Sequence, residues 1–127
     1  MNNVLSLAYI GDAVYSVYIR EFLIGKGICK VDKLQKESIN YVSAKAQAKF
    51  IESMINSDFL SEDELDIFYR ARNHKGTRHP KNTDIITYKY STGFEAIIGY
   101  LYMNHNNDRL DEFIKFILLE MYCRLLL

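Results

Sequence analysis

Residues 4–22 read VLSLAYIGDAVYSVYIREF, and this stretch is the strongest indication of the fold class. Its apolar and aromatic residues are too dense for a one-sided surface helix, which predicts a helix that is largely buried. Gly25 and Gly27 follow it and predict the end of the helix and a turn. This helix is the first of six that the sequence predicts.

Start signals and helical spacing predict the next three helices. Asp32 is a candidate cap for a helix over residues 33–39. Residues 43–56 place small and aliphatic residues at helical intervals, which predicts a third helix. Ser61 and Glu64 fit a capping box at the start of a fourth, in which each side chain bonds the other residue's backbone N–H.

The second half of the chain continues the helical pattern. Residues 73–83 contain the single proline and are expected to form a loop. Ser91 or Thr92 can cap a fifth helix that ends at residue 104, whereas the alternation over 85–90 is ambiguous between helix and strand. An amphipathic helix is expected from residue 108, with its apolar stripe at Leu110, Phe113, Ile114, Ile117, Leu118, Met121 and Leu125. We therefore expect one all-α domain over residues 1–127, a helical bundle.

Composition and charge exclude several classes of protein. The chain has 127 residues, of which 49% are hydrophobic and 25% charged, as in ordinary soluble globular domains. Cys29 and Cys123 form no metal-spaced pattern, so we expect reduced thiols. The start lacks the pattern of a signal peptide, and no run approaches the ~20 apolar residues that span a bilayer. We expect a cytoplasmic protein with no membrane partner.

Asp12 is the single charged residue in the otherwise apolar or aromatic run 7–15. Aspartate is unfavourable in a helix interior, and an unpaired buried charge is costly. Its neighbours one turn away, Ala8 and Ser16, are small enough to leave space for an ion, a water or another backbone. A structural aspartate, paired with a buried arginine or capping another helix, fits this pattern equally well.

Glu95 has a similar setting, with Gly99 one turn on and Ser91 and Thr92 one turn back. Two isolated carboxylates with small flanks suggest helices that cross closely, so that Asp12 and Glu95 face each other. Like charges held together are unfavourable unless a cation bridges them. Oxygen ligands suit Mg²⁺ or Mn²⁺, and such an ion could activate a water and stabilise charge on a phosphoryl group.

Positive charge is concentrated between residues 67 and 83. This segment contains no acidic residue and follows an acidic patch at 58–66, although the whole chain has a formal net charge of +0. Lysine and arginine on a flexible loop can contact a polyanion and release its counterions. A solvated loop without a partner is the alternative. The candidate phosphate contacts are Arg70, Arg72, Lys75, Arg78 and Lys81.

Together these segments resemble a known family. Residues 7–15 are similar to the signature helix of ribonuclease III catalytic domains, and residues 91–100 to their second acidic helix. Residues 41–48 and 70–73, with 80–84, are similar to Mini-III ribonucleases, the short bacterial branch without a separate double-stranded-RNA-binding domain. The resemblance extends over nearly the whole chain.

The resemblance implies a ribonuclease III-type helical endonuclease that forms a homodimer around duplex RNA. Each subunit would contain one acidic site that uses Mg²⁺, with Mn²⁺ as a substitute, and would leave 5′-phosphate and 3′-hydroxyl ends. Asp12 and Glu95 match the family's catalytic, metal-associated acids. The implied role is trimming the double-stranded stalk of precursor 23S ribosomal RNA.

The sequence departs from full-length ribonuclease III at three further carboxylate positions. Leu5, Ala8 and Thr92 stand there instead, so the resemblance leaves open whether one or two metal ions bind. Because the resemblance implies no separate RNA-binding domain, we expect the five basic residues of the 67–83 segment to be candidates for RNA binding. Two alternatives to the nuclease remain: a non-catalytic duplex-RNA-binding module, and a helical phosphohydrolase acting on nucleotides.

Overall fold

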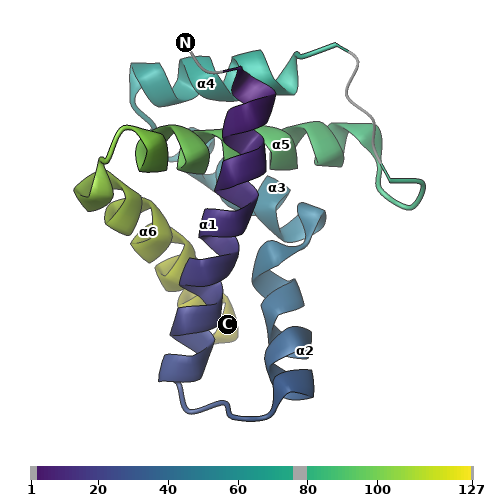
Figure 1. Cartoon of the computed structure of the whole chain (residues 1–127), viewed down its shortest axis with the longest axis vertical. Helices are drawn as coiled ribbons and strands as arrows, with labels where there is room; N and C mark the ends of the chain where they lie inside the picture. The colour runs from purple at the N-terminus through teal and green to yellow at the C-terminus, as the bar shows by residue number, and fades with distance from the viewer. Residues whose placement is uncertain (1–2, 76–79, 127) are drawn as a thin grey trace.

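The computed structural model describes residues 3–75 and 80–126, and over these residues its regular structure consists of α-helices (Figure 1). The all-α prediction is confirmed. The helices are α1 (Val4–Gly25), α2 (Val31–Val42), α3 (Ala44–Asn56), α4 (Glu62–Arg72), α5 (Ile85–Met103) and α6 (Asn107–Leu126). Among the described residues, no helix combines the length and apolar character needed to span a bilayer.

The crossing of α1 over α5 is the centre of the fold (Figure 1). Gly11 of α1 lies so close to α5 that an added Cβ would be 1.8 Å from the Glu95 carbonyl oxygen. Gly99 of α5 has the reciprocal relation, since its Cβ would be 1.9 Å from the Leu7 carbonyl oxygen. No larger residue fits at either position without moving a backbone, so the two glycines permit a direct contact between the helices.

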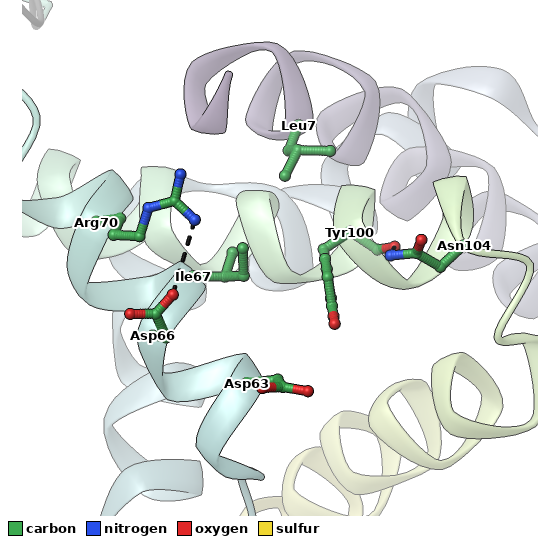
Figure 2. A pocket seen from close by; sticks show the side chains of 7 residues that line it. All are labelled: Leu7, Asp63, Asp66, Ile67, Arg70, Tyr100 and Asn104. Carbon is green, nitrogen blue, oxygen red and sulfur yellow. Dashed lines mark hydrogen bonds and ion pairs between the residues drawn. The ribbon is translucent and has the colours of Figure 1, made fainter. Parts of the chain in front are cut away.

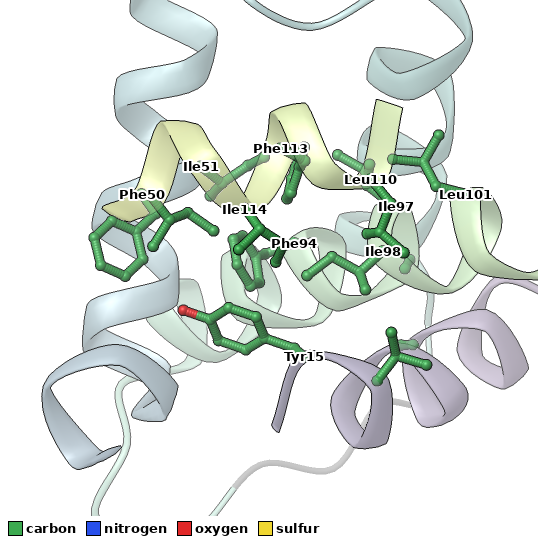
Figure 3. Close-up of a cluster of buried hydrophobic side chains, with 14 of the residues drawn as sticks. Tyr15, Phe50, Ile51, Phe94, Ile97, Ile98, Leu101, Leu110, Phe113 and Ile114 are labelled. Atoms are coloured by element: carbon green, nitrogen blue, oxygen red, sulfur yellow. The ribbon is translucent and has the colours of Figure 1, made fainter. Parts of the chain in front are cut away.

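Large side chains from four helices form the core around this crossing (Figure 3). Tyr15 of α1 meets Phe94 of α5 edge to face, with ring centroids 4.9 Å apart. Phe113 of α6 lies 5.6 Å from Phe94 by the same measure, and Phe50 of α3 is fully buried. The hydroxyl of Tyr15 donates to the Tyr41 carbonyl at 2.8 Å, which satisfies its polar end inside the core.

The predicted capping box of α4 is confirmed. Ser61 accepts from the Glu64 backbone N–H, and Glu64 accepts from the Ser61 backbone N–H. Glu64, only 3% exposed, also receives two hydrogen bonds from the Arg109 guanidinium at 2.7 and 2.8 Å. Because Arg109 also donates to the Phe59 carbonyl, one buried ion pair connects the start of α6 to α4 and the segment before it.

Two predicted helix starts are wrong. Asp32 lies in the first turn of α2 rather than at its cap, where its charge suits the helix N-terminus. Ser91 and Thr92 lie inside α5, which begins six residues earlier than Ser91, at Ile85. Asp84 is the actual cap of α5, because its carboxylate accepts from two free backbone N–H groups of the first turn.

The expectation that the first helix is largely buried is only partly correct. One face of α1 packs on the core, but Tyr9, Val17 and Ile24 are 84%, 54% and 59% exposed. The apolar stripe of α6 is also only partly buried. Its first half is buried from Leu110 to Ile117, whereas Leu125 is 76% exposed.

Candidate active site

The α1–α5 crossing brings Asp12 and Glu95 together, as the sequence predicts. Gly11, the residue before Asp12, lies against the Glu95 backbone, and the two carboxyl groups are within hydrogen-bonding reach of each other. Asp12 is exposed, whereas Glu95 is mostly buried between α1 and α3. The pair therefore has one side in the protein interior and one side open to solvent.

The environment of Glu95 favours its protonated form. The pKa of Glu95 is raised to about 8, mainly because the side chain is buried. The hydrogen bond with Asp12 and the repulsion from the Asp12 charge contribute to this increase in the pKa. A hydrogen bond from Gln47 acts in the opposite direction. Two carboxylates this close carry both charges readily only when a cation compensates them.

The buried side-chain amide of Gln47 forms a hydrogen bond with Glu95. Gln47 of α3, 1% exposed, donates from Nε2 to Glu95 Oε2 at 3.3 Å and to the Val42 carbonyl at 3.0 Å. Ser91 donates its hydroxyl to Gln47 Oε1 at 2.7 Å. Gln47 could not be predicted as a site residue, because a single glutamine among alanines on a helix has no distinctive pattern.

The acidic site consists of this pair alone within residues 3–75 and 80–126. No group of three or more His, Cys, Asp or Glu side chains there could hold a metal ion together. Thr92, at one of the positions that lack an acid, is buried and donates its hydroxyl to the Tyr88 carbonyl. Its side chain contributes to the helix rather than to the carboxylate pair.

The donor set fits Mg²⁺ or Mn²⁺ bound largely through water. These ions prefer oxygen ligands, and Mg²⁺ commonly keeps several waters while binding one or two carboxylates. Asp12 and Glu95 supply such oxygens, and the exposure of Asp12 leaves room for waters and a substrate. The chemistry of the pair is therefore compatible with phosphoryl-group hydrolysis.

The predicted basic residues that the structure describes come from the end of α4 and from the segment between α4 and α5: Arg70 and Arg72 lie in the last turn of α4, and Lys75 and Lys81 follow it. Arg70 forms an exposed ion pair with Asp66 at 3.7 Å. Arg72 stacks over the Tyr69 ring, 4.7 Å from its centroid. Lys75 and Lys81 are exposed, and Arg78 lies outside the described residues. Arg70 shares a hollow with Leu7 of α1 and Tyr100 of α5, and Arg72 lies over the first half of α5, 6.0 Å from the centroid of the Tyr90 ring.

A polar hollow of about 370 Å³ lies where α4 faces α1 and α5 (Figure 2). The Asp66–Arg70 ion pair is on its α4 side, and Tyr100 and Asn104 line its α5 side. Neither Asp12 nor Glu95 lines it. The hollow is therefore separate from the acidic pair.

Comparison with known proteins identifies the family. Residues 5–106 match the model of the ribonuclease III domain. Mini-ribonuclease 3 of Streptococcus pneumoniae is 49% identical over 113 residues, which cover 89% of this chain and 88% of that protein. Mini-ribonuclease 3 of Enterococcus faecalis is 42% identical over 113 residues, 89% of this chain and 86% of that protein.

A solved structure has the same fold. The crystal structure of a Fusobacterium nucleatum protein matches with a TM-score of 0.82 at 29% sequence identity, covering 94% of this chain and 93% of that one. The sequence matches extend over nearly the full length of both partners. The chain therefore belongs to the ribonuclease III family of endoribonucleases, in its Mini-ribonuclease 3 branch.

Proposed function

We propose that the protein is a Mg²⁺-dependent endoribonuclease that cleaves double-stranded RNA, with Asp12 and Glu95 as its catalytic, metal-associated acids. The main support is the meeting of these two carboxyl groups at the helix crossing of a ribonuclease III-type domain. The open position of Asp12 favours a polymeric substrate, which can lie across a surface, over a nucleotide enclosed in a pocket.

In this proposal the two acids have different tasks. Glu95, held by Gln47 and mostly buried, is the rigid ligand, and Asp12 reaches toward the substrate from the exposed side. When bound, Mg²⁺, or Mn²⁺ in its place, would supply Lewis-acid activation of water and compensate negative charge at the scissile phosphate. The products would have 5′-phosphate and 3′-hydroxyl ends.

We assign Arg70, Arg72, Lys75, Arg78 and Lys81 to RNA backbone binding. The cap of α5, Asp84, precedes Glu95 by 11 residues, a helical distance of about 16 Å at 1.5 Å per residue. Lys81, three residues before this cap, is therefore too distant to share a phosphate with the acidic pair and would contact the duplex away from the cut. The contribution of the basic residues to binding should weaken with salt.

We further propose that the protein acts as a homodimer. Exposed apolar side chains on α1 and α2 form one candidate interface, comprising Tyr9, Val17, Ile24, Val31 and Ile39, between 54% and 84% exposed. Ile24, Val31 and Ile39 also line a groove of about 410 Å³ between the two helices. An exposed apolar groove of this kind is typical of protein interfaces, and a two-fold dimer would present two acidic sites to one duplex.

The dimer can be tested by the mass in solution at micromolar concentration. The wild-type protein should have twice the monomer mass, and Val17→Asp should shift it to the monomer without loss of helix content. A monomeric wild-type protein under these conditions would contradict the dimer.

The resemblance to Mini-III ribonucleases suggests the cellular substrate, the duplex stalk of precursor 23S ribosomal RNA, and hence a cytoplasmic role in ribosome biogenesis. The test is incubation of purified protein with a synthetic precursor stalk, with Mg²⁺ and with a chelator. We expect Mg²⁺-dependent cuts in the duplex and none in either single strand. Binding without product at every Mg²⁺ and Mn²⁺ concentration would instead favour the non-catalytic RNA-binding module.

A further inference from the structure

Gln47 is a buried polar side chain whose hydrogen bonds connect the acidic pair to two other parts of the fold. Its amide nitrogen contacts both Glu95 and the Val42 carbonyl, and its oxygen accepts from Ser91. Val42 is the last residue of α2, so its carbonyl is one of those that a helix end leaves without an internal partner. Gln47 thus connects the α2–α3 corner to α5.

The hydrogen-bonding partners of Gln47 determine the orientation of its side-chain amide. A backbone carbonyl only accepts hydrogen bonds, so the Gln47 nitrogen, and not its oxygen, must face Val42. The nitrogen has a second hydrogen, which is directed to Glu95 Oε2, and the oxygen is left to accept from the Ser91 hydroxyl. The orientation of the amide is therefore set by the main chain, independently of Glu95.

This arrangement matters because Mg²⁺ requires near-octahedral ligand geometry. A glutamate side chain has several rotatable bonds, and its carboxylate can turn unless another group holds one oxygen. Groups that hold metal ligands in this way commonly change metal affinity by about 10- to 100-fold when they are removed.

We propose that Gln47 is a positioning residue for the nuclease reaction, which orients the Glu95 carboxylate toward Asp12 and the cation, and that Ser91 acts through Gln47. This inference rests on the proposed function of the acidic pair. It does not make Gln47 a catalytic residue, because its amide touches Glu95 and not the substrate.

The first test compares Gln47→Met with the wild-type protein, because methionine has similar length and no strong hydrogen-bonding group. We expect its Mn²⁺ affinity, measured by calorimetry without RNA, to fall by about 10- to 100-fold. Cleavage should recover toward the wild-type rate as Mn²⁺ is raised, while KM for duplex RNA stays unchanged. Unchanged Mn²⁺ affinity in a folded variant would overturn the inference.

Ser91→Ala provides a second, milder variant that removes only one oxygen atom. Ser91→Ala should weaken Mn²⁺ binding in the wild-type background and have no further effect in a Gln47→Met background, because Ser91 acts through the amide. If Gln47→Met does not fold, Ser91→Ala decides alone: weaker Mn²⁺ binding supports the inference, and unchanged binding overturns it.

Arg109→Lys is the matched control for a loss of stability, since Arg109 bonds Glu64 and Phe59 rather than the acidic pair. It should lower stability and leave Mn²⁺ affinity intact; an equal fall in affinity would show that the Gln47 effect is only structural and overturn the inference. The proposed function fails separately, if the wild-type protein neither binds Mn²⁺ nor cleaves duplex RNA.

Discussion

Replacing Glu95 with glutamine should change the pH dependence of stability in a calculable way. Burial, and then Asp12, raise the pKa of Glu95 to about 8 in the folded protein, against an ordinary value of 4.5. Between these values the folded state binds more protons than the unfolded state, so the stability from this group is fully present below pH 4.5 and is lost as pH rises toward 8. The glutamine amide has the same shape and does not titrate.

The magnitude follows from proton linkage. Between about pH 5.5 and 7.5 the folded state binds close to one extra proton at Glu95, so the free energy of unfolding should fall by about 1.4 kcal/mol per pH unit. Glu95→Gln lacks this contribution. Relative to the wild-type protein, the variant should therefore gain about 2–3 kcal/mol over that range.

The assay is urea unfolding at fixed protein concentration with a chelator present, at several pH values across this range. Taking the difference between the two proteins cancels the titration of groups that they share. Asp12→Asn is the companion variant: it removes the repulsion but not the burial, so its decline in stability should end at a lower pH than in the wild-type protein. A difference between wild type and Glu95→Gln that stays constant with pH would show that the pKa of Glu95 is not raised in the folded protein.

Two further predictions concern the framework of the site. Gly11→Ala should destabilise the protein by about 3 kcal/mol or more and abolish cleavage, because its Cβ would be 1.8 Å from the Glu95 carbonyl oxygen and would force α1 and α5 apart. Gly25→Ala is the control, because a Cβ there meets nothing within 4 Å, and it should change stability by less than about 1 kcal/mol. Thermal unfolding of both variants measures these effects, and equal effects at the two glycines would contradict the close crossing. Arg109→Met should lower the free energy of unfolding by about 3–5 kcal/mol, because it leaves the Glu64 charge buried without its partner. A loss below about 1 kcal/mol in urea unfolding would show that this pair behaves as an exposed one.

The acidic pair could be predicted from the sequence because its signal is local. Asp12 and Glu95 are isolated charges in apolar helices with small residues one turn away, and one of these, Gly99, permits the crossing together with Gly11. A single charged residue in an apolar helix needs a polar partner, and a small residue near it lets another helix approach. Together they indicate a close contact between two helices.

Other features depend on tertiary structure and had no such signal. Ser91 resembles a cap because its hydroxyl could bond a free N–H, but in the fold that hydroxyl bonds Gln47 on another helix. Dense apolar residues predict burial of α1 but do not distinguish a core from an interface, so the exposure of Tyr9 and Val17 could not be foreseen.

The role of Asp12 in catalysis is tested most directly by cleavage of duplex RNA by Asp12→Asn in the presence of Mg²⁺. Asparagine keeps the size of the side chain and removes the charge, so the helix content and assembly of the variant should match those of the wild-type protein. Asp63→Asn, at an exposed aspartate that lines the hollow beside α4, is the matched control and should cut at the wild-type rate. We expect no Mg²⁺-dependent product from a folded Asp12→Asn; cleavage at the wild-type rate by this variant would show that Asp12 is not a catalytic residue.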